Sequence, residues 1–346
     1  MRHLTVTGIR EPAPARGSRG WNCRGLSNSV NYAIRKTIHA GLTGLLVLFC
    51  SPAAAAQTVT FLSTDTLTAT KRAMSGARSA IKETHQAAVF HEFLINLESP
   101  ELPSQIEKVR ALKPSIIVTI GSGATQIAQA NFAQTPIVFA AVKYPVLSGF
   151  IETVDRPGGH TTGASLDIPV DIQFRYFKQI VPGLKRIGVL YTSNTAKLIP
   201  PARVVASQMG MELAAVEITG PRDLPRALDS LAGCTQGLWS VADPNLFDPQ
   251  STKFILLNSM RQGLPFMGFS RHVVESGALF ALDFDYKAIG RQAGQIASMV
   301  LQGADPGKIP ISAPDILWFH YNENTAKHAK IEIPAELVAI AKEVYR

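Results

Sequence analysis

Polar and aromatic side chains that can bind a ligand recur directly after apolar segments of this sequence. The clearest case is Gly121, Ser122 and Gly123, which lie between an apolar run and a segment of helical composition. The free N–H groups and the dipole at such a helix start suit a carboxylate or a phosphate. The same glycines also suit a plain tight turn, and both interpretations stay open. The motif does not match a dinucleotide fingerprint, because the third glycine is missing.

Two tyrosines and two acids stand at comparable places. Tyr144 and Tyr191 can stack on a ligand and hydrogen-bond to it, or simply pack at a loop edge. Asp243 precedes a proline and could hold a ligand amine or hydroxyl, or cap the turn, and we favour the ligand role. Asp283 and Asp285 point to the same side of an extended segment. For Asp285 the favoured role is at the start of the following helix.

Catalytic and metal-binding patterns are weak. Ser122 has no Gly-x-Ser-x-Gly elbow, since Ile120 holds the place of the first glycine. Six histidines follow residue 56, and they show neither His-x-x-x-His nor His-Glu-x-x-His spacing. We therefore expect no catalytic residue, no metal site and no cofactor.

Strands and helices must position these residues, and apolar β-branched runs alternate with segments of helical period. Ser104 and Glu107 form a capping-box pattern, Asp171 can cap the next series, and Pro334 opens a terminal helix. Strands are expected over 59–62, 89–97, 115–120, 136–141, 186–191, 212–218, 237–241, 264–269, 278–282 and 316–319. Helices are expected over 70–84, 106–112, 124–132, 172–180, 202–209, 224–231, 254–260 and 287–301, and after 334.

This alternation predicts an α/β protein with parallel sheets and right-handed crossovers. Ten strands exceed one ordinary sheet, and a break near 157–159 divides them into two doubly wound lobes. Ligands of such sheets bind beyond the carboxyl ends of the strands. The candidate ligand-binding residues are Ser63, Ser122, Gly123, Tyr144, Pro145, Tyr191, Asn194, Asp243, Ser270 and Asp283.

The N-terminal segment has the composition of a signal peptide. Arg35 and Lys36 precede a short apolar run that ends in small residues, with cleavage expected after Ala56. The alternative is an N-terminal anchor helix. Lipidation of Cys50 is not expected, because bulky Phe49 precedes it. The segment holds seven Lys/Arg and one Glu, which leaves +2 of the formal +8 for the rest. A nucleic-acid surface is therefore not indicated.

Cysteine use agrees with a chain that has no disulfide framework. Of the three cysteines only Cys234 follows the expected cleavage point. A single cysteine forms no intramolecular disulfide and no metal cluster, and we expect it to be a small buried residue.

With these residues in view, the chain resembles the ABC-transporter substrate-binding family whose best-known members bind tryptophan or other aromatic amino acids. The likeness rests on residues 116–122, 136–142, 156–163 and 277–292, with a tail-like segment over 310–330. The resemblance implies a type I periplasmic binding protein: two Rossmann-like lobes, joined by three crossovers, that close on a small molecule. It implies a periplasmic monomer that delivers its ligand to a membrane permease.

On that pattern residues 1–56 are the signal peptide. Residues 57–165 and 272–305 form the first lobe, and residues 166–271 and 306–346 form the second lobe with its tail. The resemblance carries binding roles onto Ser122, Gly123, Tyr144, Pro145, Asn194, Asp243 and Asp283.

Two positions depart from the family pattern. Tyr144 and Pro145 stand where Asp-Pro is common, and His160 stands where asparagine is common. The loss of an acid next to Lys143 argues against recognition of an α-amino group at this point. An acidic or neutral aromatic ligand becomes an alternative to an amino acid.

Competing functions use the same fold. An extracytoplasmic sensor module that reports to a membrane kinase is the main alternative to a solute receptor. A secreted α/β enzyme is disfavoured by the absence of catalytic patterns. A cytoplasmic repressor is excluded, because a signal peptide stands where a DNA-binding head would be.

Overall fold

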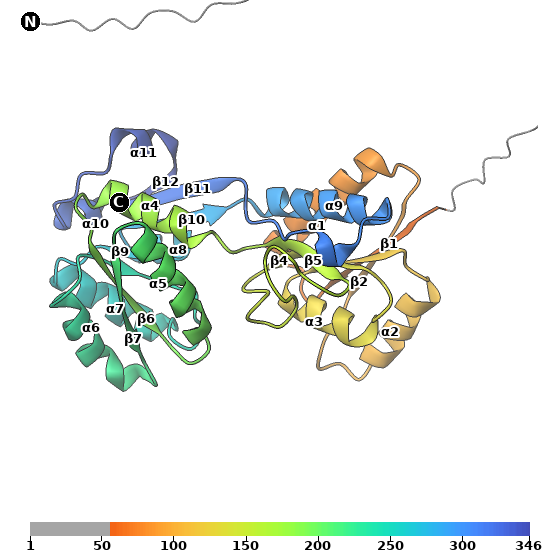
Figure 1. The fold of residues 1–346 in the computed structure, drawn as a ribbon, viewed down its shortest axis with the longest axis horizontal. Helices are drawn as coiled ribbons and strands as arrows, with labels where there is room; N and C mark the ends of the chain where they lie inside the picture. The colour runs from red at the N-terminus through yellow and green to blue at the C-terminus, as the bar shows by residue number, and fades with distance from the viewer. Residues whose placement is uncertain (1–55) are drawn as a thin grey trace, which may run out of the picture. The chain divides into compact units, whose positions relative to one another are not determined.

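The computed structural model describes residues 56–346, which form two α/β lobes built on separate sheets (Figure 1). The expectations for the leader, for Cys50 and for the segment before Ala56 fall on residues outside this range. No helix among the described residues is long and apolar enough to cross a membrane.

The first sheet is fully parallel, as its continuous apolar runs predict. All five residues of β3 are buried, which is the pattern of a strand covered on both faces. The strands are β1 (Thr58–Ser63), β2 (Val89–Leu94), β3 (Ile116–Ile120), β4 (Ile137–Val142) and β5 (Thr161–Ser165), in the spatial order β2-β1-β3-β4-β5.

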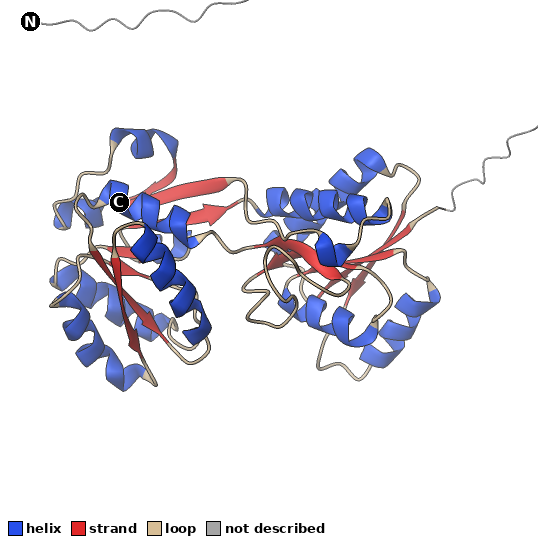
Figure 2. Ribbon diagram, in the orientation of Figure 1, coloured by secondary structure: helices blue, strands red, loops and turns tan. Residues whose placement is uncertain are grey.

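Two pairs of helices cover this sheet (Figure 2). One face packs on α1 (Thr68–Thr84) and α9 (Tyr286–Leu301), and the other packs on α2 (Leu102–Ala111) and α3 (Ser122–Asn131). The first pair is unusually close, because glycines replace side chains at the crossing. A Cβ atom at Gly290 would overlap the backbone oxygen of Ala73.

The second sheet has seven strands and one antiparallel pair, β10 with β11. Its last strand, β12, was not expected from the sequence. The strands are β6 (Arg186–Tyr191), β7 (Glu212–Glu217), β8 (Leu238–Trp239), β9 (Phe266–Gly268), β10 (Phe280–Phe284), β11 (Leu317–Asn322) and β12 (Ala341–Tyr345), in the order β12-β11-β10-β9-β8-β6-β7.

The helices of the second lobe are α4 (Val170–Ile180), α5 (Ile199–Gln208), α6 (Leu224–Ala232), α7 (Pro249–Arg261), α8 (Arg271–Glu275), α10 (Glu323–His328) and α11 (Ala335–Ile340). Five of these helices lie where the sequence predicts them, and the short α8 and α10 were not expected. Short 3₁₀ turns lie at η1 (Ala196–Leu198), η2 (Pro221–Asp223) and η3 (Pro306–Lys308).

The chain crosses between the lobes three times, but two crossings differ from the expected boundaries. The expected return to the first lobe at residue 272 comes too early, because β10 pairs with β9 and β11 in the second sheet. The expected second departure at residue 306 also comes too early. Ser165 N donates to the Ser312 oxygen, and Thr162 Oγ1 donates to the Ile309 oxygen, which ties residues up to 312 to β5.

Local signals were correct in two places and wrong in three. Asp285 caps α9 by accepting the Lys287 N–H, and Pro334 precedes α11, as expected. The capping box at Ser104 is wrong, because α2 already begins at Leu102 and Ser104 lies inside it. Asp171 lies in the first turn of α4 and does not cap it. Cys234 is exposed, not buried.

Candidate functional site

A cavity of about 240 Å³ lies where the two lobes and the first crossover meet. The loop after β4 contributes Lys143 and Tyr144, and the crossover after β5 contributes Asp167. The second lobe supplies residues that follow β8 and β9 and the end of β10. Most of the wall is apolar and includes Trp239, Met267, Phe269, Leu282 and Phe284. Such a cavity suits a ligand with a ring and few polar groups.

Tyr144 joins the lobes at this cavity. Its backbone N–H donates to both oxygens of Asp167, at 3.0 and 2.9 Å, and its hydroxyl accepts the Ala242 N–H at 3.1 Å. Its φ of 51° is a left-handed conformation that is uncommon for an aromatic residue. Backbone strain of this kind gathers at functional sites. Burial raises the pKa of the Tyr144 hydroxyl, so it stays protonated at neutral pH.

Lys143 and Asp167 are the charged residues of the cavity wall. Burial raises the pKa of Asp167 to about 6, against the opposing effects of the Tyr144 N–H and of Lys143. Burial lowers the pKa of Lys143, against the attraction of Asp167 and Asp283. Lys143 Nζ lies 5.8 Å from the centre of the Phe269 ring. In both residues burial is the main cause of the pKa shift, since burial disfavours the charged form.

The neutral polar side chains of the cavity already have partners. Gln173 Oε1 accepts the Trp239 Nε1–H at 2.7 Å, and Gln173 Nε2 donates to the Ile168 oxygen at 2.7 Å. Ser240 Oγ donates to the Met267 oxygen at 2.7 Å. These bonds hold the wall in shape and leave little polar capacity for a ligand.

The expected residues of the first lobe gather at one edge of the first sheet. Ser63 ends β1 and is buried, while Ser122 and Gly123 begin α3 next to it, and Pro145 is buried beside Tyr144. Gly121 before them has a φ of 85°, so this glycine allows the tight turn that enters α3. Of these expected residues, Tyr144 is the one that lines the cavity.

The expected residues of the second lobe gather in the same way. Tyr191 ends β6, Asn194 lies exposed in the following loop, and Ser270 precedes α8. Asp243 follows β8. The carboxyl ends of the parallel strands meet at one edge of each sheet, and that part of the expectation describes the structure correctly.

Asp243 is held by its own lobe. It is 1% exposed, and its Oδ2 accepts the Thr192 N–H and the hydroxyls of Thr192 and Thr195 at 3.2, 2.8 and 2.6 Å. Its Oδ1 accepts the Asn245 N–H at 3.0 Å. Burial alone would raise the pKa of Asp243, but the bonds from Thr195 and Thr192 outweigh it and keep the pKa below its usual value. Asp243 therefore joins two loops.

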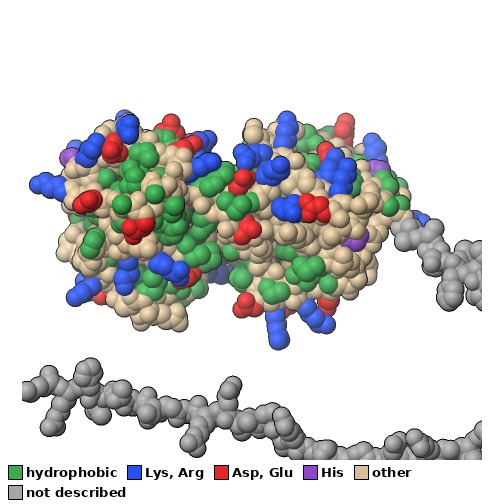
Figure 3. All heavy atoms as spheres, turned by 90° about the horizontal axis from the view of Figure 1, so that it is seen from above, with side chains coloured by type: hydrophobic (Ala, Val, Ile, Leu, Met, Phe, Trp, Pro, Cys, Tyr) green, Lys and Arg blue, Asp and Glu red, His purple; other side chains and the backbone are tan. Residues whose placement is uncertain are grey.

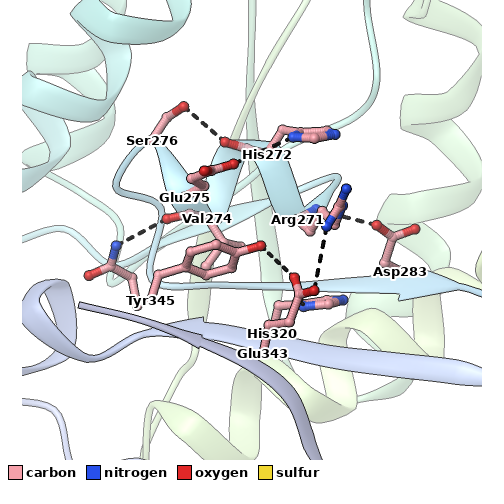
Figure 4. Close-up of polar contacts among 10 residues, drawn as sticks. Arg271, His272, Val274, Glu275, Ser276, Asp283, His320, Glu343 and Tyr345 are labelled. Atoms are coloured by element: carbon pink, nitrogen blue, oxygen red, sulfur yellow. Dashed lines mark hydrogen bonds and ion pairs between the residues drawn. The ribbon is translucent and has the colours of Figure 1, made fainter.

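Asp283 faces the far side of β10, where α8 and β12 meet (Figure 4). Its Oδ2 accepts the Arg271 N–H at 3.4 Å. The buried His320 lies nearby, with Nδ1 at 3.5 Å from Glu343 Oε2. Asp283 thus belongs to a cluster next to the cavity.

Lys143, Asp167, Gln173, Trp239 and Phe269 line the cavity but were not among the candidate binding residues. A signal for two of them was present. Lys143 precedes the candidate Tyr144, and Asp167 follows an expected crossover point, so the rule about strand ends covers both. The contribution of Trp239 could not be read from the sequence, because its strand is buried.

The surface charge and the arrangement of potential metal ligands bear on two expectations from the sequence. Basic and acidic side chains are interspersed on the face drawn in Figure 3. Within residues 56–346, no group of three or more His, Cys, Asp or Glu side chains is placed to hold a metal ion.

Comparisons with known proteins give a consistent result. A family model described as "ABC transporter substrate binding protein" matches residues 58–345. A tyrosine-binding protein of Clostridioides difficile (strain R20291) is 27% identical over 233 residues, which are 66% of this chain and 67% of that protein.

Solved structures agree in fold. The ligand-free, open structure of a substrate-binding protein with adhesive properties from Clostridium difficile is 22% identical, with a TM-score of 0.69 over 84% of this chain and 100% of that one. An ABC domain from Streptococcus pneumonia in complex with L-Trp is 18% identical, with a TM-score of 0.58 over 84% and 100%.

Proposed function

Because the chain belongs to the ABC transporter substrate-binding protein family, we propose that it captures a small organic molecule of the amino-acid or aromatic-acid class in the cavity between its lobes. It then delivers this molecule to the permease of its transporter. The observation that carries the proposal is the cavity itself, whose wall combines Tyr144 of the first lobe, Asp167 of a crossover and Trp239 of the second lobe.

Hinge closure is the mechanism that this arrangement favours. Besides the three crossovers, the Tyr144 hydroxyl joins the lobes by accepting the Ala242 N–H. A ligand that contacts both lobes binds the closed form better than the open form, and this difference in affinity drives closure.

The class of ligand draws support from the wall and from one relative. Trp239, Phe269 and Phe284 offer flat apolar surface for a ring. The relative that is 27% identical carries the name tyrosine-binding protein. An aromatic solute fits both observations.

The strand-end residues extend this site on closure. Ser122 and Gly123 at the start of α3, with Ser63, face the gap from the first lobe in this proposal. Tyr191, Asn194 and Ser270 contribute from the second lobe. Asp243 and Asp283 keep their loops in place for this contact, through the bonds that each already makes.

Thermal unfolding against a panel of amino acids, aromatic acids and purines tests the proposal. One class of compound should stabilise the protein, by about 2.7 kcal/mol at a hundred times its dissociation constant. Small-angle scattering should show a smaller radius of gyration with that compound. No stabilisation across the panel and no change in scattering would refute a solute receptor.

The ligand leaves the site chemically unchanged in this proposal. The family is one of substrate-binding proteins. Mass spectrometry of the bound compound after long incubation should return its original mass, and a product mass would contradict this part.

An extracytoplasmic place follows from the family, and periplasmic location after cleavage near Ala56 is the finer proposal. Mass analysis of the protein purified from the periplasm should give an N-terminus at Gln57. A mass that includes an acyl chain on Cys50 would contradict it.

A further inference from the structure

Lys143 lines the cavity, and its ammonium group has no hydrogen-bond or ion-pair partner among the described residues. The structure shows no hydrogen bond and no ion pair for its Nζ among the described residues, while Gln173 and Ser240 both use theirs. An ammonium has three donors and accepts nothing. Its Nζ lies over the Phe269 ring, on the apolar side of the cavity. An anionic group of a ligand would complete it.

The acids near Lys143 act on it through their charge and accept hydrogen bonds from backbone N–H groups. Asp283 accepts the Arg271 N–H on the other side of β10. Both oxygens of Asp167 accept the N–H of Tyr144, the residue next to Lys143. Neither acid lies within ion-pair distance of Lys143 Nζ, so neither neutralises it directly.

We propose that the ligand is an aromatic monocarboxylate without a charged amino group, with its carboxylate paired to Lys143 and its ring against Phe269 and Trp239. This inference rests on the proposed function and narrows its class of ligand. It makes Lys143 the residue that determines specificity, at the place where the sequence departs from its family pattern.

Charge balance couples this binding to a proton. An incoming carboxylate adds a negative charge beside Asp167, whose pKa is already about 6, and raises that pKa further. Asp167 then takes up a proton from solvent on binding, and its carboxyl becomes neutral. Lys143 and the Tyr144 hydroxyl are the other titratable groups facing Asp167. Burial raises the pKa of the Tyr144 hydroxyl, which therefore keeps its proton at neutral pH, whereas burial lowers the pKa of Lys143 against the attraction of Asp167 and Asp283. The affinity for the acid should therefore rise as the pH falls from 8 to 6.

A matched set of three compounds separates the possible ligands in calorimetry on the mature protein. These are 3-phenylpropanoate, phenylalanine and phenethylamine, which carry the same ring with a carboxylate, with both charges, or with an amine. We expect 3-phenylpropanoate to bind best and to bind about tenfold or more tightly at pH 6 than at pH 8. Its binding should be accompanied by proton uptake, measured in buffers of different ionisation enthalpy.

Two substitutions test the residues. Lys143→Met keeps a side chain of similar length and removes its charge. It should weaken 3-phenylpropanoate binding at least about 30-fold. Asp167→Asn imitates the protonated acid, so it should bind this compound at pH 8 as tightly as the unaltered protein does at pH 6. Lys82→Met is the matched control, because Lys82 Nζ lies 5.6 Å over the ring of Phe90, away from the cavity. It should bind as the unaltered protein does.

The inference fails if phenylalanine or phenethylamine binds more tightly than 3-phenylpropanoate. It also fails if Lys143→Met binds the acid normally, or if the affinity does not change between pH 6 and 8. Those results would leave a solute receptor in place. Binding of none of the three compounds also overturns the inference, and the wider panel then decides whether the protein is a receptor at all.

Discussion

The loop of Asp243 and the cavity of Lys143 and Asp167 both contain charged side chains, but they differ in how many hydrogen bonds the protein provides for those charges. Both place charged groups at the carboxyl ends of parallel strands. Around Asp243, four donors from Thr192, Thr195 and Asn245 satisfy the carboxylate. Around Lys143, the described residues give the ammonium no hydrogen bond and no ion pair, and the ring of Phe269 faces it.

This difference distinguishes charged residues that stabilise the fold from charged residues that are available to bind a ligand. A buried charge that its own protein satisfies contributes to stability, whereas one left incomplete costs stability and gains only when a partner arrives. The position of a residue at a strand end does not tell which case applies. The count of its hydrogen-bond partners does.

Removal of the Asp243 carboxylate should have the largest effect on stability. Asp243→Ala leaves buried donors of Thr192 and Thr195 without an acceptor, and we expect a loss of about 3 kcal/mol in the free energy of unfolding. Urea denaturation measures it. Asp223→Ala is a matched control, since Asp223 accepts from Thr219 and Gly220 in an exposed turn and should lose less than about 1 kcal/mol. Equal losses would remove the distinction drawn above.

Asp167→Asn should have the opposite sign. The pKa of Asp167 is raised in the folded protein to about 6, above its ordinary value of 3.8. The folded state therefore holds a proton that the unfolded chain releases, and stability is lost as the pH rises through this window. At pH 7.5 the asparagine variant should be more stable than the unaltered protein by about 1–2 kcal/mol. Near pH 4 the two should unfold at the same urea concentration.

A variant that proved less stable at pH 7.5 would show that Asp167 is satisfied in the way that Asp243 is. Asp171→Asn serves as the control, because Asp171 is exposed and paired with Arg175 on the outside of α4, so its replacement should not stabilise the protein.

Tyr144→Phe should cost about 1 kcal/mol, because the Ala242 N–H loses the hydroxyl that accepts it. The measurement is thermal unfolding without ligand. Tyr176→Phe provides the comparison, since the Tyr176 ring packs on Phe319 and its hydroxyl makes no hydrogen bond within residues 56–346. Identical melting temperatures for the two variants would mean that the Tyr144 hydroxyl holds nothing together.

Substitution of His320 should have the smallest effect on stability among these variants. It is buried, and neither ring nitrogen has a hydrogen-bond partner among the described residues. Burial lowers its pKa, against the opposing effects of Asp283 and Glu343, while Arg271 and Lys342 add to the lowering. A lowered histidine pKa means that stability is present above about pH 6.5 and is lost as the pH falls below it.

His320→Gln should not show this loss of stability at acidic pH. At pH 5.5 the free energy of unfolding should therefore differ from that of the unaltered protein by under about 1 kcal/mol in urea denaturation. Ligand affinity should stay the same, since His320 is not among the residues that line the cavity. Altered affinity would mean that the cluster of Figure 4 is part of the binding site.

Long apolar runs predicted the fold well, and single polar residues were predicted poorly. The strand at 115–120 was placed to within one residue, because a short apolar run rich in β-branched residues is typical of a strand buried on both faces. β12 was not predicted, since it follows α11 without a break and its five residues are alternately half-buried and exposed. The capping box at Ser104 failed because a local pattern competes with a helix that can start one turn earlier.

The candidate site divides along the same line. The edge of each sheet was correct, because the order of strands and helices determines it. The partners of Asp243 and Lys143 depend on how loops far apart in the chain approach each other. Thr192 and Asp243 are separated by 51 positions, and no local pattern links them.

The close crossing of α1 and α9 affects the order in which the first lobe can fold. Gly290 and Gly294 fit against the backbone of Ala73 and Ala77, so the first lobe is covered on one face by residues from near the end of the chain. The first half of that lobe therefore keeps an exposed apolar face until the residues up to 301 are also available for folding. A truncation before Tyr286 would therefore damage the lobe that was made first, and such a fragment should be recovered as aggregate.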